Sequence, residues 1–411
     1  MRFLHIADLH FGKTMGGFSL IDSKDQTEWV ERFLVKADEL KADAVVIAGD
    51  VYDRSNPGAD AVKLFDHLIT ELNRRDIPVM AVSGNHDSGD RLSFAETLLE
   101  RQGFHVAGEV KREIRKVTLT DEYGPVNFYL LPYFFPAIVS QVLEDDSVRD
   151  YDTAARRIVE AQDLDLTQRN VLLSHQNVLA NGVSPERSGS ETMVGGVGEI
   201  DYTAFDAFDY VALGHIHAGQ SMGRETVRYA GSPLCYHFQE LRHPDKGCLL
   251  ITMGEKGSVE VGKIAIEPVH PLAVIEGTHR QILEQIERID RPSYLCVVLE
   301  DDRLTREITQ SIEAVSRLKR CEVLEFDRKI TGSQAAAGTL TAQEMRSQSM
   351  DELFLRFCRE QYGSEPDAED MRLILSAMEQ IGSPARTGIH WESDKEAAAI
   401  ARLALEQEGK A

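Results

Sequence analysis

Five short polar clusters each follow a short apolar run within the first 217 residues of this 411-residue chain, and no other feature constrains its fold as strongly. The apolar runs are four to six residues long and rich in β-branched residues, which favours buried strands over helices. Helical periodicity precedes the second and third clusters, at residues 29–40 and 64–72. Strands alternating with helices predict an α/β fold with parallel pairing and right-handed crossovers. The clusters are Asp8-Leu9-His10, Gly49-Asp50-Val51-Tyr52-Asp53, Gly84-Asn85-His86-Asp87, Ser174-His175-Gln176 and Gly214-His215-Ile216-His217.

The side chains of these clusters suit a two-metal phosphoesterase centre. Two divalent metals roughly 3.5–4 Å apart can clamp a phosphate and activate a water molecule. Such a pair needs a carboxylate that touches both ions, and Asp50 is predicted to be this bridge because it stands directly after a buried strand. Alternation along an extended segment would point His215 and His217 to the same side, toward one metal pair. We expect the remaining ligands to divide between the ions: Asp8, His10 and one of the imidazoles of His215 and His217 for the first, and Asn85, His175 and the other imidazole for the second.

Mixed nitrogen and oxygen ligands suit manganese, iron or zinc better than magnesium or calcium. His86 is predicted to act in catalysis and not as a ligand, because a protonated imidazole beside the metals can hold a phosphate oxygen or protonate the departing alcohol. The neighbouring Asp87, or alternatively Asp53, could orient this imidazole or raise its pKa. His237 could face the same groove, although a structural role is favoured for it.

The composition indicates a globular protein without membrane or disulfide signals. No stretch approaches the roughly 18 consecutive apolar residues of a membrane helix, and a charged residue comes too early for a signal peptide. The five cysteines contain no Cys-x-x-Cys pair, so we expect reduced thiols and a cytoplasmic location. The net charge of −23 argues against tight DNA binding by this chain alone, because DNA-binding surfaces are usually basic. Bound cations or a partner protein could supply the positive charge.

Three regions are expected along the chain. Residues 1–267 are predicted to form the catalytic domain, in which closely spaced strands at 126–131, 247–252 and 258–262 suggest a second sheet packed on the first. Residues 268–331 alternate strand and helix, which predicts a small α/β capping domain. Residues 341–411 are expected to be helical, with two apolar stripes. These helices either fold back on the body or bind a partner helix, and the pattern favours neither.

The ordered clusters resemble the calcineurin-like metallophosphoesterase superfamily. Together with Tyr229-Ala-Gly-Ser-Pro-Leu234 they are similar to the SbcD-type subunits of bacterial SbcCD nucleases over residues 1–330. The resemblance implies an αββα sandwich of two face-to-face sheets and a manganese-dependent DNA nuclease that processes double-strand ends and hairpins. The implied activities are those of a 3′ to 5′ exonuclease and a single-strand endonuclease.

The resemblance also implies roles for single residues and for partners. It places His217 with the first metal, His215 with the second, and His86 as the catalytic histidine. Archaeal relatives have a histidine where this chain has Asp53, so the chain departs from the family's pattern at this catalytic candidate. A homodimer through helices of the nuclease domain is implied, as is an SbcC-type ATPase whose coiled coil binds the C-terminal helices.

Two other classes of function compete with a DNA nuclease. A phosphatase or small-molecule phosphodiesterase could use the same fold, although the cap and the helical tail argue against it. A binding scaffold with an inactive site is less compatible with the sequence, because every expected ligand is present.

Overall fold

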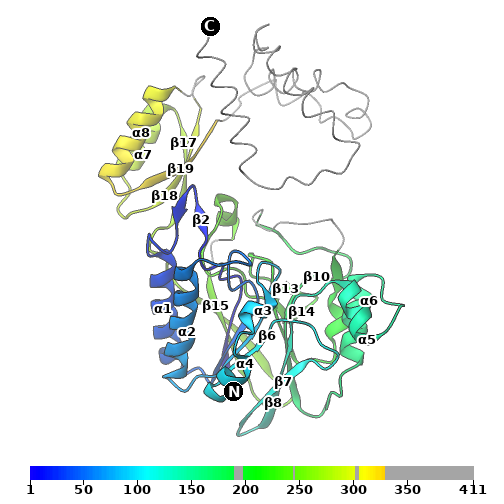
Figure 1. Ribbon diagram of the computed structural model, residues 1–411. Helices are drawn as coiled ribbons and strands as arrows, with labels where there is room; N and C mark the ends of the chain where they lie inside the picture. The colour runs from blue at the N-terminus through cyan, green and yellow to red at the C-terminus, as the bar shows by residue number, and fades with distance from the viewer. Residues whose placement is uncertain (189–197, 244–245, 301–304, 329–411) are drawn as a thin grey trace, which may run out of the picture. The chain divides into compact units, whose positions relative to one another are not determined.

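The computed structural model describes residues 1–188, 198–243, 246–300 and 305–328 (Figure 1). The helical tail predicted at residues 341–411 lies outside these ranges. Within them, the structure contains no helix whose length and apolarity would allow it to cross a lipid bilayer.

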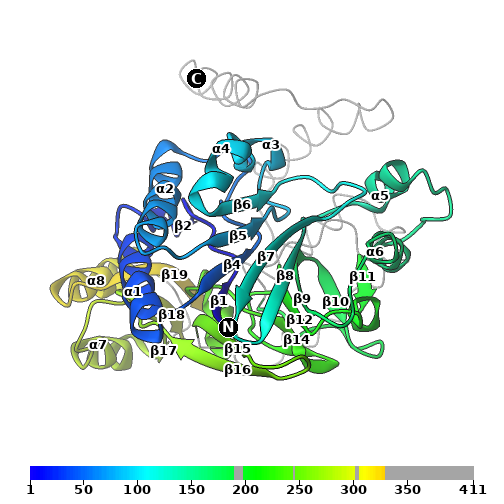
Figure 2. The same ribbon diagram turned by 90° about the horizontal axis from the view of Figure 1, so that it is seen from below.

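The first sheet contains the strands that precede the first three clusters. Its order is β16-β15-β1-β4-β5-β6, with parallel pairing from β1 to β6 and an antiparallel edge formed by β15 and β16. Helices α1 and α2 cover its outer face (Figure 2). The bounds are β1 (Arg2–Ile6), β4 (Ala44–Ala48), β5 (Val79–Val82), β6 (Phe104–Ala107), β15 (Gly247–Met253), β16 (Val259–Ala265), α1 (Asp25–Leu40) and α2 (Ala59–Asn73).

The second sheet contains the strands that precede the last two clusters. Its order is β13-β14-β12-β9-β8-β7, in which β14, β12, β9 and β8 are parallel. Helices α5 and α6 lie on its outer side (Figure 2). The bounds are β7 (Arg115–Asp121), β8 (Gly124–Leu131), β9 (Arg169–His175), β12 (Tyr210–Gly214), β13 (Ser221–Met222), β14 (Arg224–Tyr229), α5 (Pro136–Leu143) and α6 (Tyr151–Glu160).

Side-chain alternation buries both faces of both sheets. On β1, Leu4 packs with α1 and α2, whereas Phe3 packs between the sheets. On β12, Val211 packs toward α5 and α6, whereas Tyr210 meets Phe3 edge-on, with ring centroids 5.8 Å apart. Successive residues of a strand point to opposite faces, so a continuous apolar run is what a central strand of this sandwich requires. The predicted α/β sandwich of two packed sheets between helices is confirmed.

The predicted second sheet was wrong for two of its three strands. The strand at 126–131 does lie in that sheet as part of β8, but β15 and β16 belong to the first sheet. β15 pairs antiparallel with β1, from Arg2 opposite Thr252 to His5 opposite Leu249. An alternating pattern predicts a strand but not the strand with which it pairs. A long connection also allows the chain to return to either sheet.

A small α/β unit follows the two sheets. Its strands β17, β18 and β19 are parallel, and α7 and α8 pack on them through a core that includes Ile282 and Ile312. The unit contacts the body where the Tyr294 hydroxyl donates to Asp25 of α1 (2.8 Å). The boundaries at 267 and 268 remain a prediction. The bounds of the elements are β17 (Leu272–Gly277), α7 (His279–Glu287), β18 (Tyr294–Leu299), α8 (Arg306–Leu318) and β19 (Glu322–Arg328).

Short elements occupy the connections. They are β2 (Thr14–Met15), β3 (Phe18–Ser19), α3 (Gly89–Leu92), α4 (Glu96–Leu99), β10 (Asn177–Leu179) and β11 (Glu199–Asp201), with the 3-10 turns η1 (Glu100–Gln102), η2 (Tyr202–Phe205) and η3 (Phe238–Arg242).

Candidate metal centre

All five clusters meet at the carboxyl ends of the strands that precede them. The backbone N–H of Asp8 donates to the carbonyl of Gly49 (3.1 Å), and that of His10 donates to the carbonyl of Asp50 (3.0 Å). Across the sandwich, the backbone N–H of His215 donates to Oδ1 of Asp8 (2.9 Å). These bonds bring the ends of both sheets together. Open α/β sheets bind their ligands at this edge.

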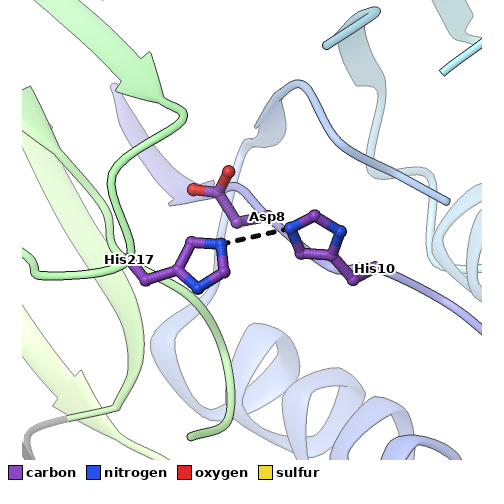
Figure 3. Close-up of side chains that lie close together, drawn as sticks. All are labelled: Asp8, His10 and His217. Carbon is purple, nitrogen blue, oxygen red and sulfur yellow. Dashed lines mark hydrogen bonds between the residues drawn. The ribbon is translucent and has the colours of Figure 1, made fainter. Parts of the chain in front are cut away.

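Asp8, His10 and His217 form a first group of possible ligand atoms, all within 4.8 Å of one another. Figure 3 shows His10 facing His217, with their Nε2 atoms 3.1 Å apart. The three side chains are buried, and Oδ2 of Asp8 has no hydrogen-bond partner in the described part of the chain. A buried carboxylate oxygen without a donor is unfavourable, and a bound cation would satisfy it.

Asp50 lies between this first group and a second one. Its Oδ2 atom is 3.6 Å from Nε2 of His10 and 3.4 Å from Nε2 of His175. Its Oδ1 atom accepts the backbone N–H of His86 (2.9 Å), which fixes the carboxylate. Asp50 also belongs to a group with Asp8 and His175 in which all possible ligand atoms lie within 4.8 Å. A carboxylate in this position can touch two ions.

The remaining candidates gather around Asn85. Its Oδ1 atom is 3.1 Å from Nε2 of His175 and 3.0 Å from Nδ1 of His215. His215 and His217 do not alternate along an extended strand as expected, because the backbone bends at His215 with a φ of 96°. The bend sends one imidazole to each group.

A backbone hydrogen bond and two glycines fix the positions of His175 and Asp50 in the second group. Nδ1 of His175 donates to the carbonyl of Ala48 (2.8 Å), so its Nε2 points into the site. A side chain at Gly49, which has a φ of 88°, would collide with the His175 ring, and one at Gly84 would collide with Asp50. Only glycine allows this close approach of backbone to ligand.

A buried hydrogen-bond network orients the imidazole of His217. The sequence did not predict this network. Nδ1 of His217 bonds with Oε1 of Glu240 (3.0 Å), and Oε2 of Glu240 accepts from Lys246 (2.6 Å) and from Ser232 (3.1 Å). Glu240 is fully buried in η3. His237 caps the same turn by accepting the backbone N–H two residues later (3.1 Å). This contact agrees with the structural role favoured for His237.

His86 faces the site from the third cluster. Its Nδ1 donates to the backbone carbonyl of Asp53 (2.9 Å), and its Nε2 lies 4.0 Å from Oδ2 of Asp50. The carboxylate of Asp53 instead binds Lys13 (2.8 Å) and lies 3.7 Å from Nδ1 of His10.

Asp87 stabilises the loops of the second and third clusters through hydrogen bonds to their backbone. Its carboxylate accepts the backbone N–H groups of Val51 (3.1 Å), Tyr52 (2.9 Å) and Gly84 (2.9 Å). These bonds join the second cluster to the third. The bonds found for Asp87 therefore support the loop that carries His86 and not its imidazole.

Burial and mutual charge set the protonation of the site. Burial raises the pKa of Asp8 to about 6. Burial also opposes ionisation of Asp50, but the imidazoles around it, His175 first, hold its pKa well below the ordinary value. Burial works against protonation of His175, yet Asp50 raises its pKa to about 9. Burial lowers the pKa of His10, and lowers that of His215 to about 3. Neutral imidazoles and ionised carboxylates are the forms that bind metals.

The donor set fits two divalent cations. The orphaned oxygen of Asp8, the facing imidazoles of His10 and His217, and the central carboxylate of Asp50 all present lone pairs to the same small space. Imidazole with carboxylate and amide oxygen is a ligand set for first-row transition metals.

Two solved structures show weak similarity to this chain. The protein TT1561 of Thermus thermophilus is 11% identical with a TM-score of 0.37, over 64% of this chain and 98% of that one. A psychrophilic β-glucosidase, BglU from Micrococcus antarcticus, is 12% identical with a TM-score of 0.20, over 79% of this chain and 83% of that one. Scores this low carry no argument.

Two family models match the chain in succession. Residues 1–219 match the calcineurin-like phosphoesterase model, which is more than half of the chain and includes all five clusters. Residues 268–362 match the type 5 capsule protein repressor C-terminal domain, the model for the C-terminal domain of SbcD. The two matches together indicate a hydrolase that acts on phosphodiester bonds, and the grouped side chains indicate that it uses divalent metals. The chain therefore belongs to the calcineurin-like phosphoesterase family, as an SbcD-type nuclease subunit.

Proposed function

We propose that this protein is a manganese-dependent DNA nuclease that degrades double-strand ends from 3′ to 5′ and cuts single strands and hairpins, together with an SbcC-type ATPase. One observation carries the proposal: the carboxylate of Asp50 lies between two groups of possible metal ligands, in a chain that matches the SbcD C-terminal domain. In this proposal the first ion is held by Asp8, His10, Asp50 and His217, and the second by Asp50, Asn85, His175 and His215.

His86 would assist the reaction beside the metals. Divalent ions bound here would polarise the phosphodiester and activate water. The bond from Nδ1 of His86 to the carbonyl of Asp53 leaves Nε2 free to face the phosphate. From there it can hold a phosphate oxygen or donate a proton to the departing alcohol. Asp53 and Asp87 act through the loops that place this imidazole and His10.

The test uses end-labelled duplex and hairpin DNA with Mn²⁺ or Mg²⁺, with and without a coiled-coil ATPase partner. We expect Mn²⁺-dependent loss of nucleotides from 3′ ends and cleavage at hairpin tips, both increased by the partner and ATP. The control is His86→Ala, which should keep both metals in elemental analysis while losing roughly 100-fold or more of turnover. Loss of metal from this variant would make His86 a ligand and contradict its proposed role.

A phosphatase on the same fold is the second candidate, because the metal groups alone do not select a substrate. Hydrolysis of nitrophenyl phosphate without cleavage of any DNA, in the presence of the ATPase partner, would favour it over the nuclease. Such a result would leave the metal centre in place and change only the substrate.

We also propose a homodimer and a partner-binding tail. Phe94 is 79% exposed and Leu98 is 67% exposed on the α3–α4 segment, and we propose that these two apolar side chains contribute to the dimer contact. The match to the SbcD C-terminal domain supports binding of an SbcC-type ATPase through the C-terminal region. A cytoplasmic location stays a prediction.

A further inference from the structure

We propose that the cleft beside Asn85 and His215 is a subsite for one unpaired nucleobase, next to the phosphate held at the metal centre. This inference rests on the proposed function, because it names the part of a nucleic acid that the cleft would take. The cleft has a volume of about 930 Å³, and Asn85 and His215 connect it to the metal centre. Its other walls include the start of α5 and the residues that follow β9.

The α5 wall is an exposed apolar platform. Phe135 is 56% exposed and Ile138 is 44% exposed. Tyr133 holds Phe135 edge-on, with ring centroids 5.2 Å apart and an interplanar angle of 85°. The Tyr133 ring lies 6.4 Å from that of His175, so the platform begins beside the metal ligands. Exposed aromatic faces next to a phosphate site are stacking surfaces for bases.

The wall after β9 carries carboxamides without partners. Gln176 is 1% exposed and Asn177 is 6% exposed. Nε2 of Gln176 and both polar side-chain atoms of Asn177 nevertheless have no hydrogen-bond partner in the described residues. Buried amides are nearly always bonded. A carboxamide pairs a donor with an acceptor, which matches the edge of a base, and Gln176 and Asn177 both line the cleft.

The charge of the cleft excludes a second phosphate as its ligand. Asp87 and Glu109 line it, and its described lining contains neither Lys nor Arg. Proteins hold phosphate backbones with cationic groups, whereas an uncharged aromatic ring needs only stacking and hydrogen bonds. A base inside a duplex is covered by its neighbours, so the base that enters is unpaired, as at a frayed end or a hairpin tip.

The test compares two ligands that share a phosphate and differ in the base: deoxyadenosine 5′-monophosphate and 2-deoxyribose 5-phosphate. Isothermal titration uses the full chain loaded with Mn²⁺. We expect the nucleotide to bind roughly 5- to 150-fold more tightly, the range given by stacking of one base. Phe135→Ala should remove most of this difference. Asn177→Ala should weaken the nucleotide alone.

The matched control is Tyr123→Ala. Tyr123 is 50% exposed in the turn between β7 and β8 and does not line the cleft. Its variant should keep the full preference for the nucleotide. Equal affinities of the unmodified protein for the two ligands, or an equal loss in Phe135→Ala and Tyr123→Ala, would overturn the subsite. Preference for the nucleotide without cleavage of any DNA would instead retain the subsite and overturn the nuclease proposal.

Discussion

At the scale of single residues, the site depends on groups that aim its ligands. The imidazole of His217 is held by Glu240, and that of His175 by the carbonyl of Ala48. Such outer contacts fix which nitrogen faces the metal and increase its basicity. His10 is held less firmly, because its Nδ1 is 3.7 Å from Asp53, beyond hydrogen-bond length.

Replacing Glu240 with Gln should weaken metal binding. The amide cannot match the carboxylate as an acceptor for Nδ1 of His217, and loss of such outer partners typically weakens metal affinity about 10- to 100-fold. Isothermal titration with Mn²⁺ measures the change. Because the variant also leaves the buried Lys246 without its counter-charge, the control is the double variant Glu240→Gln/Lys246→Met. Recovery of full affinity in that double variant would show that the charge of Lys246, and not the aim of His217, caused the loss.

Metal binding should release protons at neutral pH. In the metal-free protein the pKa of His175 is raised to about 9, so this imidazole is protonated at pH 7 and must lose its proton to bind a metal. Affinity for Mn²⁺ should therefore increase with pH and level off above about pH 9. Titration in buffers of different ionisation enthalpy measures the released protons. A constant affinity between pH 7 and 9 would contradict this protonation of His175.

The gathering of the candidate ligands could be predicted from sequence, because residue type and the end of an apolar run are both local features of the chain. Asp50 and His175 each follow an apolar run directly, and the structure brings them within 3.4 Å. Glu240 could not be found in this way, because it follows no strand and lies in a short 3-10 turn. The bonds of Asp87 to backbone N–H groups could not be predicted, because adjacency in sequence does not give side-chain direction.

At the scale of elements, strands were predictable and their neighbours were not. β1, β4 and β12 form where their apolar runs predicted them. The apolar pattern of β15 would also suit a strand of the second sheet. Its pairing with β1 is what places it in the first sheet. The pairing of strands that are distant in sequence depends on tertiary packing, so it cannot be predicted from the local sequence pattern.

A buried ion pair in the second sheet also bonds with residues at the ends of strands of the first sheet. Arg169 at the start of β9 is 2% exposed and binds the carboxylate of Asp121 at the end of β7. Asp121 also accepts from the amino group of Met1, which precedes β1 in the first sheet. Arg169 further donates to the carbonyls of Gly124 (2.7 Å) and Gly254 (2.9 Å). The guanidinium of Arg169 therefore connects the turn between β7 and β8 to the turn between β15 and β16.

Replacing Asp121 with Asn should destabilise the fold by about 3–5 kcal/mol at pH 7, because the buried guanidinium loses its counter-charge. Arg169 holds the pKa of Asp121 well below its ordinary value. The stabilisation is therefore present above the ordinary pKa of about 4 and declines as the pH falls below it. Urea unfolding at pH 7 and pH 3 should show a smaller difference at pH 3. The control, Asp60→Asn, alters an exposed pair with Lys63 and should change little at either pH.

At the scale of the whole molecule, charge and apolar surface point to assembly. The net charge of −23 opposes strong DNA binding by a lone chain, so we expect a partner protein or bound cations to supply positive charge for DNA binding. Composition could predict this need for partners, but it could not locate a contact surface. Phe94 and Leu98 belong to no sequence motif, and only the fold shows that each of them is exposed.

Introducing charge on the α3–α4 surface should dissociate the proposed homodimer. Glutamate at Phe94 and Leu98 would place two carboxylates in an apolar contact, where burial of unpaired charge is strongly unfavourable. Sedimentation should then show monomer for Phe94→Glu/Leu98→Glu and dimer for the unmodified protein. The control, Leu166→Glu, changes a 59% exposed leucine in the connection between α6 and β9 and should remain dimeric. The metal centre lies within one chain, so the monomeric variant should still bind Mn²⁺. A double variant that stays dimeric would exclude this surface, because two buried carboxylates on each side could not be tolerated there.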